Sequence, residues 1–176
     1  MNFRNVILAL AMIGMIAAPV PVIAQVPVAA SADHASMLAS SDPKLAANKR
    51  LVYEFWREVF EAAQMDRVGS YLAESYIQHN PNVPTGRAAF VEFFSKVKQP
   101  KPIESKVSAP LVAMTAEGNL VILSFVREMP EPSDPSRKYT TTWFDMFRVE
   151  DGKIVEHWDV IQALPAGPTA SGHPAH

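Results

Sequence analysis

The chain has 176 residues, of which 48% are hydrophobic and 19% are charged, which is the composition of an ordinary globular protein. This length favours a single domain. A formal net charge of −2 provides no basic surface for nucleic acid, so nucleic-acid binding is not expected. The sequence contains no cysteine, which excludes disulfides and thiol chemistry and leaves a hydrophobic core as the source of stability.

The first 24 residues have the pattern of a signal peptide. Arg4 supplies positive charge, residues 6–18 form an apolar run, and residues 22–24 (Val-Ile-Ala) end in the small-residue pattern that signal peptidase accepts. Cleavage before Gln25 is expected, which predicts a periplasmic or secreted protein without membrane contact. An uncleaved N-terminal anchor is the alternative, although the apolar run is short for a membrane span.

The next part of the chain predicts helices. Residues 25–41 are rich in Ala, Ser, Val and Pro and predict a flexible linker, in which His34 has no role. Asp42 and Pro43 are typical of a helix start. Apolar residues then recur with the spacing of one helical face, at Val52, Phe55, Trp56, Val59, Phe60 and Ala63. A short second helix is expected through Val68 and Leu72, and Thr85 is expected to cap a third helix that ends before Gln99.

The second half of the chain predicts strands. Residues 103–111 alternate between apolar and polar and favour a half-exposed strand, whereas residues 120–126 are apolar throughout and favour a central strand. Residues 128–136, with three prolines and three acids, predict a mobile loop, either a lid or a plain connection. With a short strand near residue 77, the pattern gives helices covering one face of an antiparallel meander, an α+β domain over residues 42–164. Residues 165–176 are predicted to be disordered.

Two strands of a hairpin over residues 139–162 place titratable groups together. A three-residue loop at residues 150–152 would put Asp145 opposite His157 and Trp143 opposite Asp159. One face then carries Trp143, Asp145, Phe147, Val149, Val155, His157, Asp159 and Ile161. Because burying charge is costly, such a cluster is either a structural pair at a sheet end or a functional site.

The other face of the hairpin is also largely apolar. It carries Phe144, Met146, Ile154, Trp158 and Val160, together with Arg148 and Glu156. A sheet with two apolar faces needs a second cover. A homodimer through this outer face is the hypothesis that we draw from it.

The motifs favour acid–base chemistry. The sequence has no Gly-rich phosphate loop, no Ser nucleophile elbow and no metal-ligand spacing, so neither metal nor cofactor is expected. A facial triad of His79, His157 and one Asp stays as an alternative. A carboxylate in an apolar pocket has a raised pKa and can act as a base near neutral pH, which suits removal of a proton next to a carbonyl group or activation of water. His79 either transfers protons or bonds to the loop backbone.

Three motifs resemble one family. Residues 76–81 (Tyr-Ile-Gln-His-Asn-Pro), residues 86–90 (Gly-Arg-Ala-Ala-Phe) and residues 145–159 are similar to the SnoaL-like polyketide cyclase branch of the NTF2-like superfamily. The resemblance covers roughly Lys44 to Leu164. It implies an α+β cone, in which helices close a curved sheet around a hydrophobic pocket. It also implies that Asp159 is a general acid/base for aldol condensation, without metal or cofactor.

We therefore predict a cofactor-independent acid–base enzyme of the cyclase or isomerase type, acting on a small hydrophobic carbonyl compound. Asp159, His157, Asp145 and His79 are the expected catalytic residues, and the expected substrate-binding residues are Asn80, Tyr76, Trp143, Phe147 and Trp56. The alternative is an exported binding protein for a small apolar ligand. A dimeric accessory domain with an unused pocket is a third reading.

Overall fold

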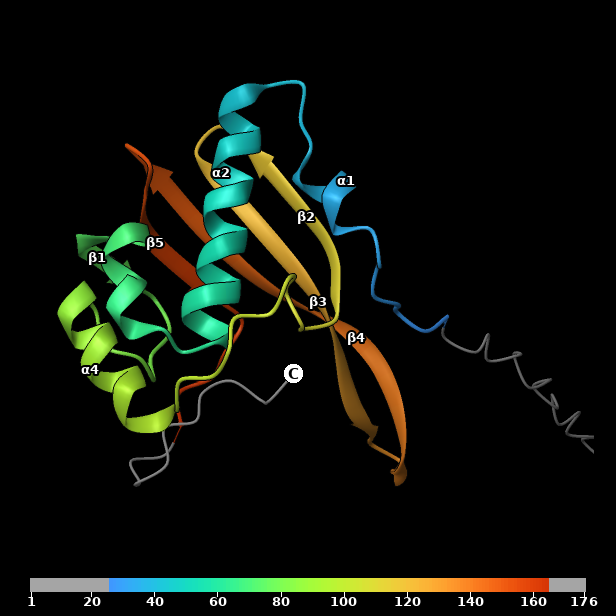
Figure 1. Ribbon diagram of the computed structural model, residues 1–176. Helices are drawn as coiled ribbons and strands as arrows, with labels where there is room; N and C mark the ends of the chain where they lie inside the picture. The colour runs from blue at the N-terminus through green and yellow to red at the C-terminus, as the bar shows by residue number, and fades with distance from the viewer. Residues whose placement is uncertain (1–25, 165–176) are drawn as a thin grey trace, which may run out of the picture.

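A layer of helices packs on one face of a curved five-stranded sheet (Figure 1). The structure is a computed structural model that describes residues 26–164. The predicted signal peptide, residues 1–24, and the predicted tail, residues 165–176, lie outside the described residues. Among residues 26–164, no helix is both long and apolar enough to cross a membrane.

The sheet has the strand order β1-β5-β4-β3-β2. Four strands form an antiparallel meander, and β1 pairs with β5 in parallel. The strands are β1 Leu72–Gln78, β2 Leu111–Glu117, β3 Leu120–Glu131, β4 Asp134–Glu150 and β5 Lys153–Asp159. The predicted meander and the short strand near residue 77 are confirmed. The apolar stretch over residues 120–126 lies in β3, which is an inner strand as predicted.

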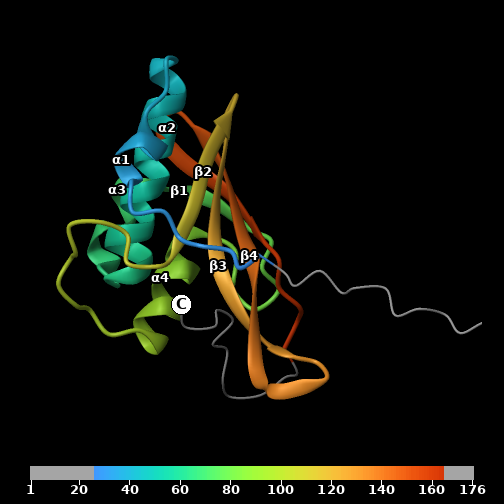
Figure 2. The ribbon, with the colours of Figure 1, turned by 90° about the vertical axis from the view of Figure 1, so that its right-hand side faces the viewer.

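The helices lie on one side of this sheet (Figure 2). They are α1 His34–Leu38, α2 Pro43–Glu54, the π-helix Phe55–Glu61, the 3-10 turn Met65–Arg67, α3 Val68–Tyr71 and α4 Arg87–Val97. The start of α2 is confirmed, because the Asp42 carboxylate accepts hydrogen bonds from the main-chain N–H groups of Lys44 and Leu45. The predicted cap of α4 is wrong: Gly86 holds the N-cap position with φ +98°, and Thr85 bonds to the main chain of Gln78.

The long helix that follows Asp42 changes its winding at Phe55. Residues 55–61 form a π-helix, in which more residues share each turn than in an α-helix. Phe55 and Trp56, at the start of this π-helix, are both buried. Trp56 stacks on Phe125 of β3 with ring centroids 4.6 Å apart, which joins the helix layer to the sheet.

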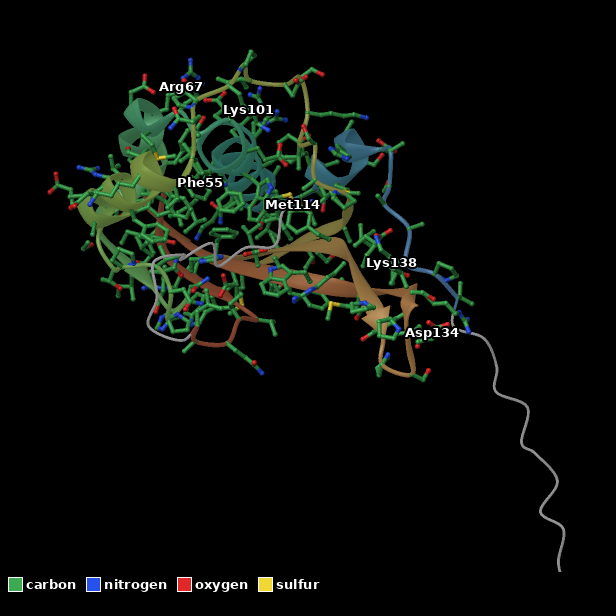
Figure 3. All side chains as sticks on the ribbon, turned by 90° about the horizontal axis from the view of Figure 1, so that it is seen from below. Phe55, Arg67, Lys101, Met114, Asp134 and Lys138 are labelled. Carbon is green, nitrogen blue, oxygen red and sulfur yellow. The ribbon has the colours of Figure 1, made fainter. Side chains whose placement is uncertain are left out.

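Apolar side chains fill the space between the helices and the sheet (Figure 3). The largest fully buried ones are Trp56, Trp143, Tyr76, Phe125, Phe147, Leu72, Leu111, Leu123 and Ile154. Fully burying an apolar side chain of this kind contributes about 1.5–3 kcal/mol. In the described part of a chain without disulfides, this core is the main source of stability.

The segment before β2 differs from the prediction. Residues 103–110 are not a strand, and β2 begins only at Leu111. Side chains of the helix layer bind the backbone here: the Tyr53 hydroxyl accepts the N–H of Val107, and the Glu61 carboxylate accepts the N–H groups of Ser108 and Ala109. Val107 and Ala109 are buried, so the alternating pattern reflects packing against helices and not strand pairing.

The predicted loop over residues 128–136 is also wrong. β3 and β4 continue through it as a two-stranded ribbon, in which Met129 pairs with Tyr139 and Pro130 with Lys138. The ribbon extends away from the helices, and Asp134 and Lys138 lie near its tip (Figure 1, Figure 3). The segment is therefore a paired extension of the sheet and not a loop.

The predicted linker is ordered over the residues that the structure describes. It contains α1, and the N–H of Ser31 bonds to the carbonyl of Leu111 at the start of β2. Lys49 of α2 donates to the carbonyls of Met37 and Ala39. His34 is not idle, because its Nδ1 lies 2.8 Å from the Tyr53 hydroxyl. The segment therefore packs against the domain that it was expected to precede loosely.

The register of the hairpin formed by β4 and β5 corrects the prediction. The turn has two residues, Asp151 and Gly152, both with positive φ (47° and 69°), so Glu150 pairs with Lys153. The register then shifts between Val149 and Arg148, and the strand beyond pairs two positions further along than expected.

This shift decides the neighbours of the titratable residues. Asp145 lies opposite Asp159, and Phe147 lies opposite His157, so the predicted pairs of Asp145 with His157 and of Trp143 with Asp159 are wrong. The two-residue turn alone would place Asp145 and His157 on opposite faces of the sheet. The bulge shifts the pairing by one more residue, so both side chains still lie on the core face. Between the turn and the bulge, β5 turns its other side chains toward the core. Ile154 is buried and Val155 is half-buried, which is the reverse of the prediction.

Candidate functional site

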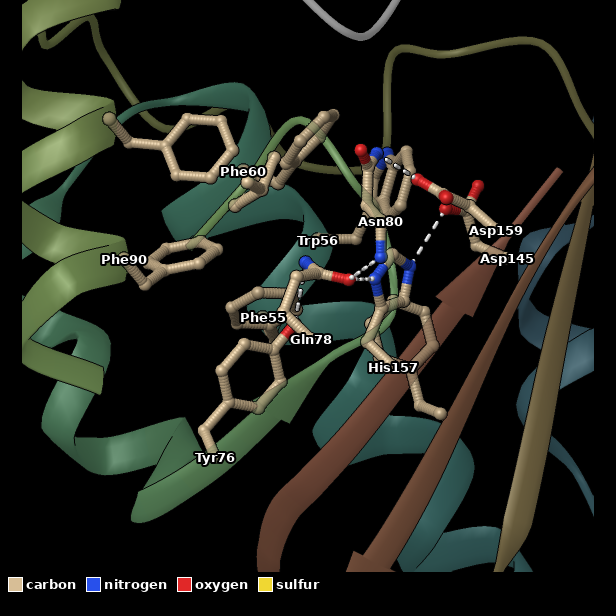
Figure 4. Close-up of a pocket in the computed structure, with 13 residues that line it drawn as sticks. Phe55, Trp56, Phe60, Tyr76, Gln78, Asn80, Phe90, Asp145, His157 and Asp159 are labelled. Atoms are coloured by element: carbon tan, nitrogen blue, oxygen red, sulfur yellow. Dashed lines mark hydrogen bonds and ion pairs between the residues drawn. The ribbon is translucent and has the colours of Figure 1, made fainter. Parts of the chain in front are cut away.

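A small cavity lies between the helices and the core face of the sheet, at the end of β1 and β5 (Figure 4). Its volume is about 30 Å³, which is room for one or two water molecules. Aromatic side chains form most of its wall, and polar groups from β1, β4 and β5 close one side. The lining residues are Phe55, Trp56, Phe60, Tyr76, Gln78, Asn80, Val83, Phe90, Phe94, Asp145, Phe147, His157 and Asp159.

The meander supplies three titratable groups to this cavity. Asp145 of β4 and Asp159 of β5 lie directly opposite each other, and His157 precedes Asp159 by two residues on the same face. One ligand atom from each of the three lies within 4.8 Å of the others. His157 Nε2 is 3.0 Å from Asp145 Oδ1, in a pair with side-chain exposures of 8% and 0%. The pair is therefore almost closed to water.

β1 supplies the amide groups. Tyr76 and Gln78 alternate along the strand, so both point toward the cavity, and Asn80 follows on the same side. The Asn80 Nδ2 donates to Asp159 Oδ2 at 2.6 Å. The Asn80 Oδ1 in turn accepts the main-chain N–H of Asn82, which fixes the direction of the amide. Asn80 thus holds the Asp159 carboxylate from the loop that leaves β1.

Gln78 connects the two halves of the site. Its Oε1 lies 2.9 Å from His157 Nδ1 and accepts the main-chain N–H of Asn80 at 3.0 Å. Its Nε2 donates to the Tyr76 hydroxyl at 3.1 Å. One side chain therefore contacts a tyrosine, a histidine and the backbone that carries Asn80 (Figure 4).

Burial changes the acidity of two groups. The pKa of Asp159 is raised, chiefly because burial disfavours its charged form, and the nearby Asp145 adds to this; His157 and the hydrogen bond from Asn80 partly offset the effect. The pKa of the Tyr76 hydroxyl is well above its usual value, again chiefly through burial and then through Asp159 and Asp145. The cavity thus holds a carboxylate of increased basicity beside a neutral phenol.

The same cluster offers ligands for a divalent cation. Asp145, His157 and Asp159 would contribute two carboxylate oxygens and one ring nitrogen, a donor set that suits several transition metals. The alternative triad that includes His79 is not assembled, because His79 lies on the other face of the sheet. None of the acid–base steps considered below requires a metal.

Most of the predicted site residues meet at the cavity. Asp159, His157, Asp145, Asn80, Tyr76, Phe147 and Trp56 all line it.

His79 does not line the cavity. Its side chain is 43% exposed, stacks on Trp158 with ring centroids 5.0 Å apart, and lies with Nε2 2.7 Å from Glu156 Oε1. Because neighbours along an extended chain point to opposite sides, the inward direction of Gln78 and Asn80 puts His79 outside.

Trp143 is the second correction. It is buried at 2% exposure but is not among the cavity-lining residues. It precedes Asp145 by two positions on β4, toward the ribbon, and the Arg127 guanidinium lies 4.5 Å from its ring centroid. It is therefore a core residue that does not line the cavity.

The prediction missed Gln78 and several aromatic residues. Gln78 has the same signal as Tyr76, since it lies two residues further along a short strand, and this alternation was available in the sequence. Phe55, Phe60, Phe90 and Phe94 belong to predicted helix faces, and sequence periodicity does not separate a cavity wall from a solid core.

Several solved structures are similar. A candidate SnoaL-like polyketide cyclase from Jannaschia sp. CCS1 is 15% identical, with 69% of this chain and 90% of that one covered and a TM-score of 0.47. A candidate polyketide cyclase from Acidithiobacillus ferrooxidans is 13% identical, with 69% and 89% covered and a TM-score of 0.46. An LEH-like epoxide hydrolase from M. tuberculosis is 14% identical, with 66% and 84% covered and a TM-score of 0.47.

The sequence comparisons are more specific about family than about activity. No curated protein matches the chain. The family model of the SnoaL-like domain matches residues 52–157, which is more than half of the chain. This range includes β1 and every residue that lines the cavity except Asp159. The chain therefore belongs to the SnoaL-like domain family, and its helices and open curved sheet form an α+β cone.

Proposed function

We propose that this protein is a cofactor-independent acid–base enzyme acting on a small hydrophobic carbonyl compound, in a reaction of the aldol or isomerase type. Asp159 is the base that removes the proton next to the carbonyl group. The observation that supports the proposal best is the position of this carboxylate: it is held by Asn80 in an aromatic cavity, and its pKa is raised by burial.

The chemistry follows from this environment. A base is most effective when its pKa approaches the working pH, and burial moves Asp159 in that direction. Removing a proton next to a carbonyl places negative charge on the carbonyl oxygen, which needs a hydrogen-bond donor. Tyr76 lines the same cavity as a neutral phenol and provides a donor of this kind.

The size of the cavity limits the substrate. At about 30 Å³ the cavity is smaller than the pockets that usually hold organic ligands, so we infer that part of its wall moves when a substrate binds. Phe60, on the π-helix, is the half-buried member of that wall, whereas Phe55 and Phe90 are fully buried. Movement of Phe60 would enlarge the cavity on the side of the π-helix.

The test is catalysed proton exchange in D₂O. The purified protein is incubated with a panel of small hydrophobic ketones and β-keto esters, and deuterium uptake next to the carbonyl is followed by NMR. We expect Asp159→Asn to slow the exchange by about 10²–10⁴-fold, the usual contribution of a positioned base. His79→Gln is the matched control outside the cavity and is expected to retain the exchange. Undiminished exchange in Asp159→Asn would contradict the proposal.

The alternative function is binding of a small apolar ligand, for which the aromatic wall is the supporting observation. The same experiment separates the two. If panel compounds shift the NMR signals of cavity residues while neither the unmodified protein nor Asp159→Asn exchanges protons, the protein is a binder.

We further propose that the chain is exported and that residues 1–24 are removed. The support is the sequence pattern of those residues. Mass spectrometry of the protein recovered from the periplasm or the medium is expected to give an N-terminus at Gln25. A full-length chain in the membrane fraction would instead favour the uncleaved anchor.

A further inference from the structure

We infer that Gln78 is a positioning residue that sets the protonation of His157, and that the contact between His157 and Asp145 holds a proton which leaves this pair without net charge. This inference deepens the proposed function. It rests on that function only where it predicts an effect on Asp159 as the base. It follows from hydrogen-bond geometry in three steps.

The first step fixes the direction of the Gln78 amide. The main-chain N–H of Asn80 lies 3.0 Å from Oε1, and a main-chain N–H only donates, so the atom that it meets is an acceptor. A flipped amide would place its own NH₂ group against this N–H. The amide nitrogen therefore faces the Tyr76 hydroxyl, 3.1 Å away.

The second step fixes one proton of His157. Its Nδ1 lies 2.9 Å from the same Gln78 oxygen. Since that atom is an acceptor with two lone pairs, it accepts from Asn80 with one and from His157 with the other. Nδ1 therefore carries a hydrogen.

The third step concerns the other nitrogen. A neutral imidazole carries one N–H, which Nδ1 already uses, so Nε2 would present a lone pair to Asp145 Oδ1 at 3.0 Å. An ionised carboxylate also presents lone pairs, and in a pair that is 8% and 0% exposed, two facing acceptors would repel each other. A proton therefore lies in the contact, either on Nε2 or on Oδ1.

Both placements give the pair the same charge. An imidazolium with a carboxylate and a neutral imidazole with a carboxylic acid each sum to zero. This explains how two aspartates share one small cavity, because Asp145 is balanced within its pair. Asp159 then carries the negative charge of the site and is the group available as the base.

Without Gln78 the balance changes. His157 would be free to carry its single proton on Nε2 and donate it to an ionised Asp145, and the pair would have a charge of −1. The titratable groups of the cavity are Asp145 from β4, His157 and Asp159 from β5 and Tyr76 from β1, whereas the helices contribute aromatic side chains. The added charge would therefore act directly on Asp159 and disfavour its ionised form.

The experiment reads the protons of His157 directly. The full-length protein is labelled with ¹⁵N-histidine, and long-range ¹H–¹⁵N correlation spectra distinguish protonated from bare ring nitrogens. The chain has five histidines, and His157→Gln identifies the relevant signals. We expect a protonated Nδ1 in the unmodified protein. A bare Nδ1 with the proton only on Nε2 would overturn the inference, and this outcome needs no substrate to be known.

Two variants sharpen the result. Gln78→Met keeps the length of the side chain but removes the acceptor, and is expected to move the His157 proton from Nδ1 to Nε2. Tyr76→Phe removes the other partner of the amide and leaves both contacts of Oε1 in place, so the His157 signals are expected to stay as in the unmodified protein. An unchanged His157 spectrum in folded Gln78→Met would overturn the assignment of Gln78.

The second readout is the pH dependence of proton exchange. Gln78→Met is expected to move the acidic limb of the profile upward by roughly one pH unit, the scale of a like charge a few ångströms away. Tyr76→Phe is expected to lower the rate without moving that limb. If no panel compound is exchanged, the proposed function fails while the NMR result still stands.

Discussion

Two histidine–carboxylate pairs lie on opposite faces of the same sheet, and their environments differ completely. His157 and Asp145 lie on the core face with side-chain exposures of 8% and 0%, whereas His79 and Glu156 lie on the outer face with exposures of 43% and 15%. His79 and His157 lie on neighbouring strands that pair side by side, and the N–H of His79 bonds to the carbonyl of His157.

The pKa values of two carboxylates on β5, Glu156 and Asp159, are shifted in opposite directions. The pKa of Glu156 is lowered, first by its hydrogen bond with His79 and further by Arg148, because these two partners stabilise the charged form. The pKa of Asp159, on the core face of the same strand, is raised by burial. Residue types alone therefore do not distinguish a surface ion pair from a site for proton transfer; the face of the sheet does.

Exchanging one histidine from each pair is the strongest test of this contrast. His157→Gln is expected to slow proton exchange roughly 10–100-fold, because Asp145 loses its balancing partner and its charge disfavours ionisation of Asp159. His79→Gln is expected to leave the rate within about twofold, in line with a surface position. Equal losses in the two variants, measured by deuterium uptake, would remove the distinction between the faces.

Replacing one carboxylate from each pair tests stability. Asp145→Asn is expected to lower the free energy of unfolding by about 1–3 kcal/mol, because it weakens a hydrogen bond that is closed to water. Glu156→Gln is expected to cause a smaller loss, because the side chain of its partner His79 is 43% exposed to solvent. Urea denaturation of both variants measures the difference, and a larger loss in Glu156→Gln would contradict it.

The raised pKa of Asp159 predicts a smaller effect with a definite sign. The folded state keeps this proton to a higher pH than the unfolded state, so the stability that Asp159 contributes is present below the ordinary aspartate range and is lost as pH rises through the raised value. Asp159→Asn has no such loss. It is expected to be slightly more stable than the unmodified protein at neutral pH and equal to it in acid, as thermal unfolding across pH would measure.

A substitution on the outer face of the sheet is expected to have the smallest effect on the stability of the folded chain. Phe144 is 48% exposed and Val160 is 66% exposed on the face that no helix covers. We propose that a second copy of the chain covers them in a homodimer. Phe144→Glu is expected to shift the sedimentation coefficient from dimer to monomer with little change in the unfolding of the monomer. A monomeric unmodified protein at high concentration would contradict the proposal.

Much of the architecture was predictable because it depends on short-range patterns. Asp42 and Pro43 predicted the start of α2, and the apolar residues 120–126 predicted an inner strand. Alternation along β4 and β5 predicted that Asp145, His157 and Asp159 would meet on one face. The resemblance to the SnoaL-like branch predicted the α+β cone and a hydrophobic pocket.

Other features depended on contacts between distant residues. The strand expected over residues 103–111 failed because helix side chains of Tyr53 and Glu61 bind its backbone. The loop expected over residues 128–136 failed because two strands continue pairing beyond the core. A local sequence pattern shows neither cause. Tyr53 and Glu61 lie far in the sequence from the segment that they bind. The pairing over residues 128–136 continues the register of β3 with β4, which is set in the core.

The sequence by itself determined which residues are titratable and which face of each strand is apolar, because side-chain direction follows from the period of the backbone. Only the tertiary structure decided that Asp145 faces Asp159, that His79 lies outside and that Gln78 binds His157. These outcomes depend on a two-residue turn, one bulge and the parallel pairing of β1 with β5. A register is set by the packing of the whole sheet, and a shift of one residue moves every side chain of the strand to the other face.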